Sequence, residues 1–245
     1  FISIYQTLTN HSPYNLAPEQ YYSESYLKSR LGELGRQLNK IIIAPNIISS
    51  ILSADDALHF FINEFKKDER FNNTIFIIVG DHAVNLNLRK HALERFHVPL
   101  IIYSPLIEKS AAFAGMCSHI DIAPSLLALL ENNFDLVFSP EKHFIGEGLD
   151  TSITFNANRS IPLTVNRMET PSFIVNSTMM QGNNYYDLDE NWDSKLASEA
   201  NKAFAVKRIK SYKIINKIVC DENRIWPFPK VILHNRYLVE SSLRE

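Results

Sequence analysis

Cysteine and glycine are both scarce in this sequence. The two cysteines, Cys117 and Cys220, lie far apart and form no Cys-x-x-Cys pair. Neither a thiolate zinc knuckle nor a disulfide framework follows from them, and they leave the redox compartment open. Seven glycines are present in 245 residues, and Gly146 and Gly148 are badly placed for a loop that cradles phosphate. No apolar run approaches the roughly 18 residues that would span a bilayer.

Net charge is also nearly absent. The chain has 25 basic and 27 acidic residues, which gives a formal charge of −2 and no electrostatic reason to expect nucleic acid as a partner. A basic cluster between Lys202 and Lys213 has the spacing of a solvated helix face. At 45% hydrophobic residues, the chain can bury one large core or two unequal ones.

The central element predicted from the sequence is residues 74–80, a run rich in β-branched side chains and free of charge. It predicts a strand buried on both faces, as in parallel sheets covered by helices. Residues 1–8 predict another strand, and because the chain opens on it we expect a segment of a longer protein. A helix is predicted over residues 53–67, with Ser53 as its N-cap, and a further buried strand over 98–103.

The second half predicts a helix over residues 118–130, antiparallel strands around 163–165 and 172–175, and one long amphipathic helix over 194–220. The expected fold is α/β, with a mostly parallel buried sheet flanked by helices, a small antiparallel C-terminal sheet and a long terminal helix. We expect residues 1–155 to form the C-terminal portion of an α/β core. Residues 156–245 are expected to pack on the same core.

Side chains able to bind a metal follow two of the predicted strands. Asp81 and His82 come directly after the strand that ends at Gly80, and His11 follows the first strand. Ligands in open α/β sheets bind outside the carboxyl ends of the strands, so these three residues are expected at one edge. Carboxylate oxygen and imidazole nitrogen from consecutive residues can hold one divalent ion.

Two other interpretations stay open at this point. Asp81 and His82 could simply form hydrogen bonds to the backbone of their loop. His11 could be a metal ligand or a donor to a substrate oxyanion, and periodicity does not distinguish these roles.

Five sequence blocks, taken together, resemble the ordered motifs of the sulfatase-like enzymes of the alkaline phosphatase superfamily. The blocks are TLTNHSPYN at 7–15, NTIFIIVGDH at 73–82, HVPLIIYSP at 97–105, SHIDIAPSLLALL at 118–130 and GEGLDTS at 146–152. The Leu-Thr-Asn-His-Ser-Pro form is most similar to the branch of lipoteichoic acid synthases and phosphoglycerol or phosphoethanolamine transferases. True sulfatases more often have a shorter His-x-Pro there, and a glycine where this chain has Ala83.

The resemblance implies an alkaline phosphatase-like fold and a role for each matching residue. Asp81 and His82 match the metal-binding pair, which would hold zinc, manganese, magnesium or calcium. His11 matches the histidine that contacts the transferred phosphate or sulfate group, and His91, or else His97, could contact the same anion. The implied substrate is an anionic phospho- or sulfo-ester carried on a lipid or a glycan.

The resemblance also implies a reaction that this chain does not complete alone. The nucleophile of the family, and an acidic metal ligand, precede the block around His11, so we expect the isolated chain to be inactive and to bind metal weakly. Its expected partner is the missing N-terminal segment of the same protein, which in this branch carries a membrane anchor and places the enzyme outside the cytoplasm. The alternatives are a sulfatase or phosphodiesterase that releases its group to water, and a non-catalytic binding or sensor module.

Overall fold

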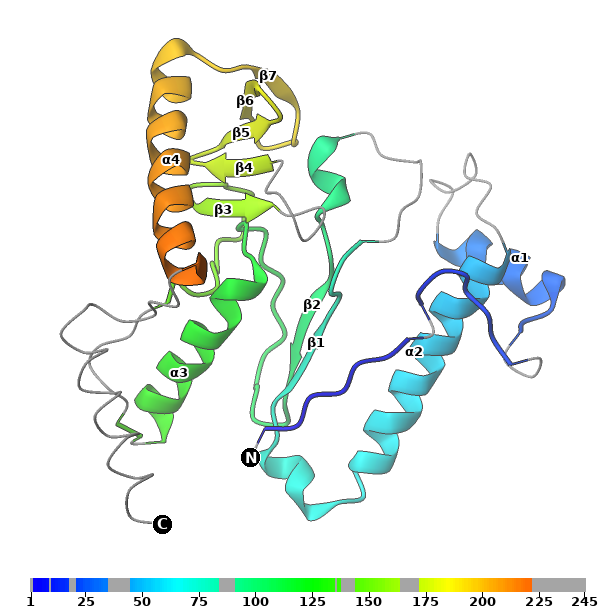
Figure 1. Cartoon of the computed structure of the whole chain (residues 1–245). Helices are drawn as coiled ribbons and strands as arrows, with labels where there is room; N and C mark the ends of the chain where they lie inside the picture. Colours follow the sequence, from blue (N-terminus) through cyan, green and yellow to red (C-terminus); the bar gives the residue numbers. More distant parts are fainter. Residues whose placement is uncertain are drawn as a thin grey trace. The chain divides into compact units, whose positions relative to one another are not determined.

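The computed structural model describes residues 2–8, 10–17, 21–34, 45–83, 91–134, 136–137, 144–163 and 172–221 (Figure 1). The chain divides into two units, Phe1–Ser110 and Ala111–Glu245. The division into residues 1–155 and 156–245, as parts of one catalytic core, stays a prediction.

Helices α1 (Glu24–Leu34) and α2 (Pro45–Phe65) pack together in the first unit. Ile48 and Leu52 are one helical turn apart on α2, and both are buried against Leu27 of α1. The helix predicted over 53–67 therefore begins eight residues earlier than expected. Ser53 is buried inside α2 and does not cap it, because the apolar periodicity continues upstream of Ser53.

An aromatic cluster joins α2 to the short elements that follow it. These are η2 (Glu69–Asn73), β1 (Phe76–Val79) and β2 (Leu100–Tyr103), and the single turn η3 (Ala92–Arg95) falls between the two strands in the sequence. The ring of Phe76 lies 5.3 Å from Phe65, 6.0 Å from Phe71 and 5.9 Å from Tyr103, measured between ring centroids. Aromatic pairs at these distances add to the stabilisation from burial alone.

Strands β1 and β2 pair antiparallel, with Phe76 opposite Tyr103 and Val79 opposite Leu100. The prediction of a parallel pair was therefore wrong for these strands, and so was burial on both faces, since β1 is half-buried and its last residue is exposed. Parallel neighbours need a crossover, usually a helix. The described parts of the connection, residues 80–83 and 91–99, hold only the single turn η3.

Residues 2–8 were expected to form a strand and do not. They are exposed and outside any strand, with Ile2 and Ile4 about nine-tenths accessible to solvent. Tyr5 makes a ring contact with Phe61 of α2, 6.0 Å between centroids. An apolar, β-branched sequence favours a strand, but a strand also requires a hydrogen-bonded neighbour.

The second unit contains a five-stranded antiparallel sheet in the order β3-β4-β5-β6-β7, which confirms the predicted C-terminal sheet. Its strands are β3 (Ser160–Leu163), β4 (Ser172–Val175), β5 (Thr178–Gln181), β6 (Asn184–Leu188) and β7 (Ser194–Leu196). Asn176 and Ser177 link β4 to β5 with positive φ angles of 47° and 64°. Two such residues form the tight hairpin turn whose twist matches the strands it joins.

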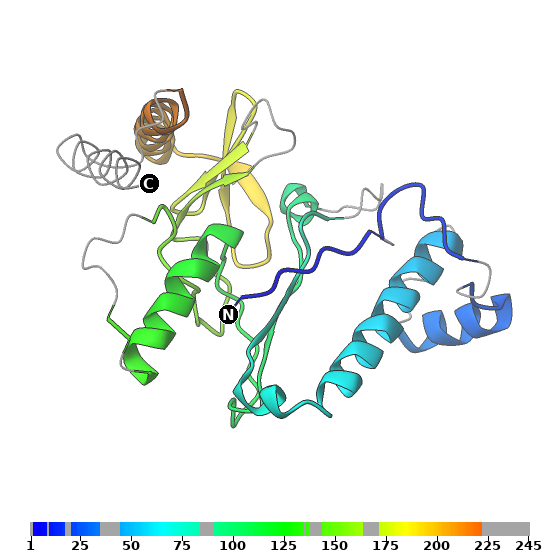
Figure 2. The ribbon, with the colours of Figure 1, turned by 60° about the horizontal axis from the view of Figure 1, so that its bottom comes forward.

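Helix α4 (Glu199–Asp221) is the predicted long helix, and it runs crosswise over one face of this sheet (Figures 1 and 2). Ala205 and Ile209 of α4 are buried against Phe173 of β4 and Met180 of β5. The ring of Tyr212 meets Phe173 edge-on at 5.0 Å between centroids.

The segment 194–196, which was expected to begin this helix, is instead strand β7, so α4 starts at Glu199. The late segment around Trp226 lies outside the described residues.

Helix α3 (Ile122–Asn133) follows the single turn η4 (His119–Asp121) in the second unit. Ser118 and Asp121 cap this start reciprocally, each side chain accepting a hydrogen bond from the backbone N–H of the other. Gly146 passes so close to this turn that a Cβ atom there would lie 2.1 Å from the carbonyl oxygen of Ile120. The helix predicted over 118–130 is confirmed in position and shifted slightly toward the C-terminus.

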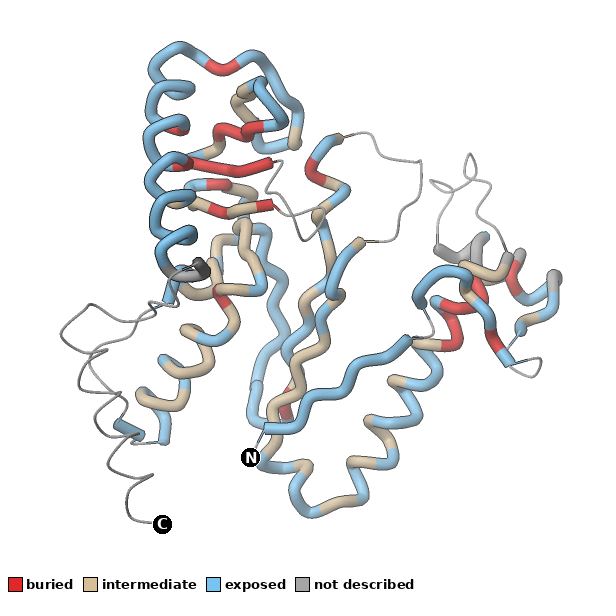
Figure 3. The backbone as a smooth tube through the Cα atoms, viewed as in Figure 1, coloured by how far each residue is buried: buried red, intermediate tan, exposed pale blue. Residues whose placement is uncertain are grey.

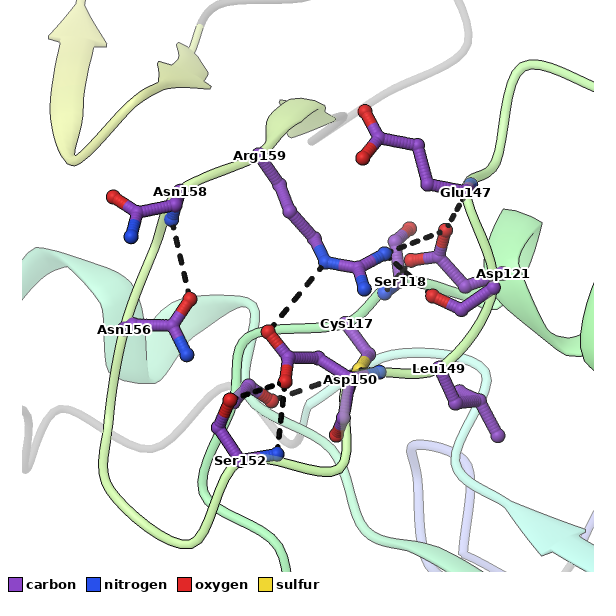
Figure 4. A network of polar contacts seen from close by, with 12 residues as sticks. Cys117, Ser118, Asp121, Glu147, Leu149, Asp150, Ser152, Asn156, Asn158 and Arg159 are labelled. Atoms are coloured by element: carbon purple, nitrogen blue, oxygen red, sulfur yellow. Dashed lines mark hydrogen bonds and ion pairs between the residues drawn. The ribbon is translucent and has the colours of Figure 1, made fainter.

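A buried ion pair ties this turn to the loop that leads into β3 (Figure 4). Asp121 is 2% exposed, and its carboxylate accepts hydrogen bonds from the backbone N–H groups of Ser118 and Glu147, at 2.8 and 2.9 Å. The guanidinium of Arg159 lies 3.3 Å from the same carboxylate and donates a hydrogen bond to the carbonyl oxygen of Gly148.

Asp150 extends this network on the other side of Arg159. Its carboxylate accepts hydrogen bonds from the backbone N–H and hydroxyl of Ser152, at 2.8 and 2.6 Å, and lies 3.9 Å from the Arg159 guanidinium. The hydrogen bonds from Ser152, led by that of its hydroxyl, lower the pKa of the Asp150 carboxyl. The Cys117 sulfur accepts a further hydrogen bond from the Asp150 N–H, and burial raises the pKa of this thiol.

Candidate functional site

His11 lies in the turn that follows residues 2–8. The turn is closed by two backbone hydrogen bonds, from the N–H of His11 to the carbonyl of Leu8 at 3.0 Å and from the N–H of Tyr14 to the carbonyl of His11 at 2.8 Å. The His11 side chain is exposed, and its Nδ1–H donates a hydrogen bond to the carbonyl oxygen of Ser12 at 2.6 Å. A carbonyl oxygen can only accept a hydrogen bond, so the ring proton of this neutral imidazole is on Nδ1. The lone pair is then on Nε2.

Asp81 and His82 follow β1 directly, as the sequence predicts. Gly80 allows the chain to approach β2 here, because its N–H bonds to the carbonyl of Pro99 at 3.1 Å and a Cβ on Gly80 would lie only 3.1 Å from that of Val98. The backbone N–H of His82 donates to the Asp81 carboxylate at 2.9 Å.

The His82 ring, like the His11 ring, is held by a hydrogen bond from Nδ1 to a backbone carbonyl oxygen. Its Nδ1–H donates to the carbonyl oxygen of Ala83 at 3.2 Å, which holds the proton on Nδ1. The Nε2 atom of His82 then lies 3.8 Å from the second carboxylate oxygen of Asp81, and both side chains are about 70% exposed. A backbone acceptor on one imidazole nitrogen is the usual arrangement for a histidine that binds metal through the other nitrogen.

The structure brings His11 next to His82, although 70 residues of sequence separate them. Their rings meet nearly edge-to-face, at 78°, with 6.4 Å between centroids. The turn after residues 2–8 and the end of β1 therefore place their polar side chains at one location within the first unit.

The donor set fits part of a metal site. Two ligands at about 2.1 Å from a common ion can be at most about 4.2 Å apart, so the 3.8 Å between His82 Nε2 and the Asp81 carboxylate is within that limit. Among the described residues, no group of three or more His, Cys, Asp or Glu side chains is arranged to hold a metal ion. A complete site would need further ligands.

The other histidines occupy varied positions. His91 is half-buried directly before η3, and His97 is exposed shortly after it. The assignment of His91 to the anion stays a prediction. His59 is an exposed residue of α2 that forms a hydrogen bond with Asn63 at 2.9 Å, and His119 lies in η4 of the second unit. His143 and His234 lie outside the described residues.

Sequence reasoning missed the two backbone carbonyls that orient the rings, at Ser12 and Ala83. No sequence signal reveals them, because every residue type has a carbonyl oxygen. It also missed the Asp121–Arg159–Asp150 network, in which Asp121 was interpreted only as part of a helix first turn. Asp121 falls in one of the matched sequence blocks, but its ion-pair partner Arg159 is 38 positions away in the chain and in no block.

The fold is mixed α/β, and it brings a histidine and an Asp-His pair from two separate segments to one location. A model of the sulfatase family matches residues 1–132, more than half of the sequence, and the chain belongs to this family. The match includes His11, Asp81 and His82. It agrees with the resemblance carried by the sequence blocks.

A solved structure with a similar fold is that of the lipoteichoic acid synthase LtaP from Listeria monocytogenes. The TM-score is 0.55 at 18% sequence identity, and the match covers 79% of this chain and 48% of that chain. The likeness shows the fold, and the chain spans about half the length of LtaP. A search of curated proteins found no match. No helix among the described residues is both long and apolar enough to cross a membrane.

Proposed function

We propose that the chain is part of a metal-dependent enzyme that transfers a phosphoglycerol or phosphoethanolamine group through a covalent enzyme intermediate. In this proposal Asp81 and His82 bind a divalent ion, and His11 contacts the transferred group. The approach of the His11 and His82 rings beside Asp81 is the observation that supports it most directly. The nucleophile, the remaining metal ligands and a membrane anchor that holds the enzyme outside the cytoplasm would come from another segment of the same protein.

The three side chains would have different chemical roles. A bound divalent ion would polarise the phosphoryl oxygens and activate a hydroxyl nucleophile. The Asp81 carboxylate and the Nε2 lone pair of His82 are the atoms that would hold it. Because Nδ1 of His82 already donates to the Ala83 carbonyl, the ring presents its lone pair without reorienting.

The hydrogen bond from His11 Nδ1 to the Ser12 carbonyl determines which protonation state each of the two possible roles of His11 requires. With the proton on Nδ1, a neutral ring presents only a lone pair at Nε2 and could bind metal. To donate a hydrogen bond to a phosphoryl oxygen, the ring must carry a second proton on Nε2. We propose this second role, in which the charged imidazole stabilises the negative oxygens as the group is transferred.

A metal-binding measurement on the chain tests the ligand assignment. Calorimetry with Mn²⁺ and Zn²⁺ should give weak binding, because the described residues supply only two closely spaced donors. Asp81→Ala should weaken this binding further, and His59→Ala, an exposed histidine of the same unit, should not change it. Tight nanomolar binding that disappears in Asp81→Ala would contradict the view that the site needs another segment.

An activity measurement on the whole protein tests the role of His11. The change His11→Ala should slow turnover by about 10² to 10³-fold, as the loss of a donor to a developing oxyanion typically does, and leave metal content unchanged. His59→Ala is again the matched control. Loss of the metal in His11→Ala would instead show that His11 is a metal ligand. In the unmodified whole protein, release of the transferred group to water, and not to an acceptor alcohol, would show that the enzyme is a hydrolase.

A further inference from the structure

Helix α4 uses only a narrow stripe of its surface to pack on the sheet. Ala205 and Ile209 are buried and Tyr212 is half-buried, whereas nearly every other described side chain of the helix is exposed. Figure 3 shows the same pattern, with exposed residues along most of α4. A helix of 23 residues therefore presents most of its circumference to its surroundings.

Large apolar side chains gather on the side of α4 that faces away from the sheet. Phe204, Ile214, Ile215 and Ile218 are 47%, 52%, 59% and 40% exposed. At about 100° of rotation per residue, the four fall within an arc of about 100°, roughly opposite the Ala205–Ile209 stripe. Single exposed apolar residues are ordinary, but four on one side of one helix form a patch that the sheet contact does not explain.

Basic side chains border and interrupt this patch. The helix contains five lysines and one arginine but only two acidic residues, although the whole chain carries a net charge of −2. Lys207 falls within the apolar arc, and Arg208 and Lys210 lie at its two borders by the same rotation. All three are exposed. The pattern is that of a basic amphipathic helix, which is typical of helices that lie on anionic membrane surfaces.

We propose that the outer face of α4, made of Phe204, Lys207, Ile214, Ile215 and Ile218, binds the surface of an anionic lipid bilayer. The helix lies parallel to the membrane plane, with the isoleucines and Phe204 at the boundary between headgroups and acyl chains. The lysines keep their ammonium groups among the negative headgroups while their methylenes cover apolar surface. The charge favours an anionic surface, and the isoleucines favour a bilayer over a soluble polyanion. The inference does not depend on the function of the site at His11.

Sedimentation of the 245-residue chain with lipid vesicles tests this proposal. The chain should bind vesicles of equal parts phosphatidylglycerol and phosphatidylcholine, should bind pure phosphatidylcholine far more weakly, and should be released by salt. The double change Ile215→Ser and Ile218→Ser should lower the partition coefficient about tenfold or more. Lys207→Gln should lower it about fivefold, the usual contribution of one basic residue at such a surface.

Matched controls come from exposed residues elsewhere. Leu129→Ser on α3, where the leucine is 40% exposed, and Lys66→Gln in the first unit should leave the partition coefficient unchanged. All changes are at exposed positions, and circular dichroism verifies that the fold is retained.

Three results would overturn the proposal. The first is binding that the isoleucine changes do not weaken, which would make the contact purely electrostatic. The second is equal binding to phosphatidylcholine alone. The third is a chain that ignores vesicles and forms dimers which Ile215→Ser and Ile218→Ser dissociate, in which case a second copy covers this face.

Discussion

Replacing Arg159 with methionine should destabilise the second unit through a single buried charge. Methionine retains much of the aliphatic volume of the arginine but removes the guanidinium that lies 3.3 Å from the Asp121 carboxylate. The Asp121 side chain is 3% exposed and that of Arg159 is 13% exposed, so water cannot readily replace the lost partner. The change leaves a negative charge in a nearly closed environment.

The expected loss follows from the contacts that remain. Removing one partner of a buried ion pair costs about 3 to 5 kcal/mol. Asp121 keeps two hydrogen bonds, from the backbone N–H groups of Ser118 and Glu147, so the lower end of that range applies. We expect the free energy of unfolding to fall by about 3 kcal/mol, which lowers the melting temperature by about 10 °C in a unit of this size.

Urea unfolding followed by tryptophan fluorescence measures this loss, because Trp192 belongs to the second unit and residues 1–110 contain no tryptophan. The matched control is Lys202→Met on α4, whose partner Glu199 is 3.7 Å away and has a side chain that is 90% exposed. Exposed pairs contribute about 0 to 1 kcal/mol, so this variant should unfold almost as the parent does. If Arg159→Met changed the free energy of unfolding no more than Lys202→Met, the buried ion pair would not stabilise the second unit.

Further predictions concern four other positions. Gly146→Ala should destabilise the second unit by about 3 kcal/mol, because the added methyl group meets a backbone carbonyl at 2.1 Å. Gly32→Ala in α1, where nothing lies within 4 Å, should instead stabilise its helix by about 0.5 to 1 kcal/mol, and thermal unfolding measures both. Burial and then the hydrogen bond to a carboxylate raise the pKa of Tyr22 from 10.0 to about 12. Folding therefore favours the protonated Tyr22. Its contribution to the free energy of unfolding is fully present below pH 10 and is lost as the pH rises toward 12. Tyr22→Phe should remove this pH dependence from alkaline unfolding curves. In a Cys220→Ser background, Cys117 should react with a disulfide reagent more slowly than a free small thiol does, because burial raises its pKa, and denaturant should restore the rate; equal rates in the folded chain would contradict this.

The sequence predicted the elements of the second unit better than those of the first. The antiparallel character of the C-terminal sheet, with strands expected around 163–165 and 172–175, and most of helix α4 follow from local signals, namely alternating apolar residues, turn residues and a long amphipathic repeat. Strand β7 was not predicted, because its residues were assigned to the helix. The direction of β2 relative to β1 is not a local property. An apolar strand has the same sequence pattern whichever way its neighbour runs, so the antiparallel pairing of Phe76 with Tyr103 required the structure.

The candidate site was predictable to the level of which residues meet. The sequence placed His11, Asp81 and His82 after two predicted strands at one edge of a parallel sheet. The strand before His11 does not form, but the histidine rings still lie 6.4 Å apart. The orientation of each ring was not predictable, because it depends on the backbone conformation of Ser12 and Ala83. The start of α2 was misplaced for a similar reason. Ser53 has the chemistry of a cap, but burial against α1 decided its position.

The order of strands in the second unit has a consequence for how the chain acquires its fold. Every neighbouring pair from β3 to β7 joins strands that are consecutive along the chain. Contacts of this kind close short loops, so each hairpin forms at a small entropic cost and gives the next strand an edge to join. A nascent chain leaving the ribosome can assemble this sheet strand by strand, in the order in which the strands are synthesised.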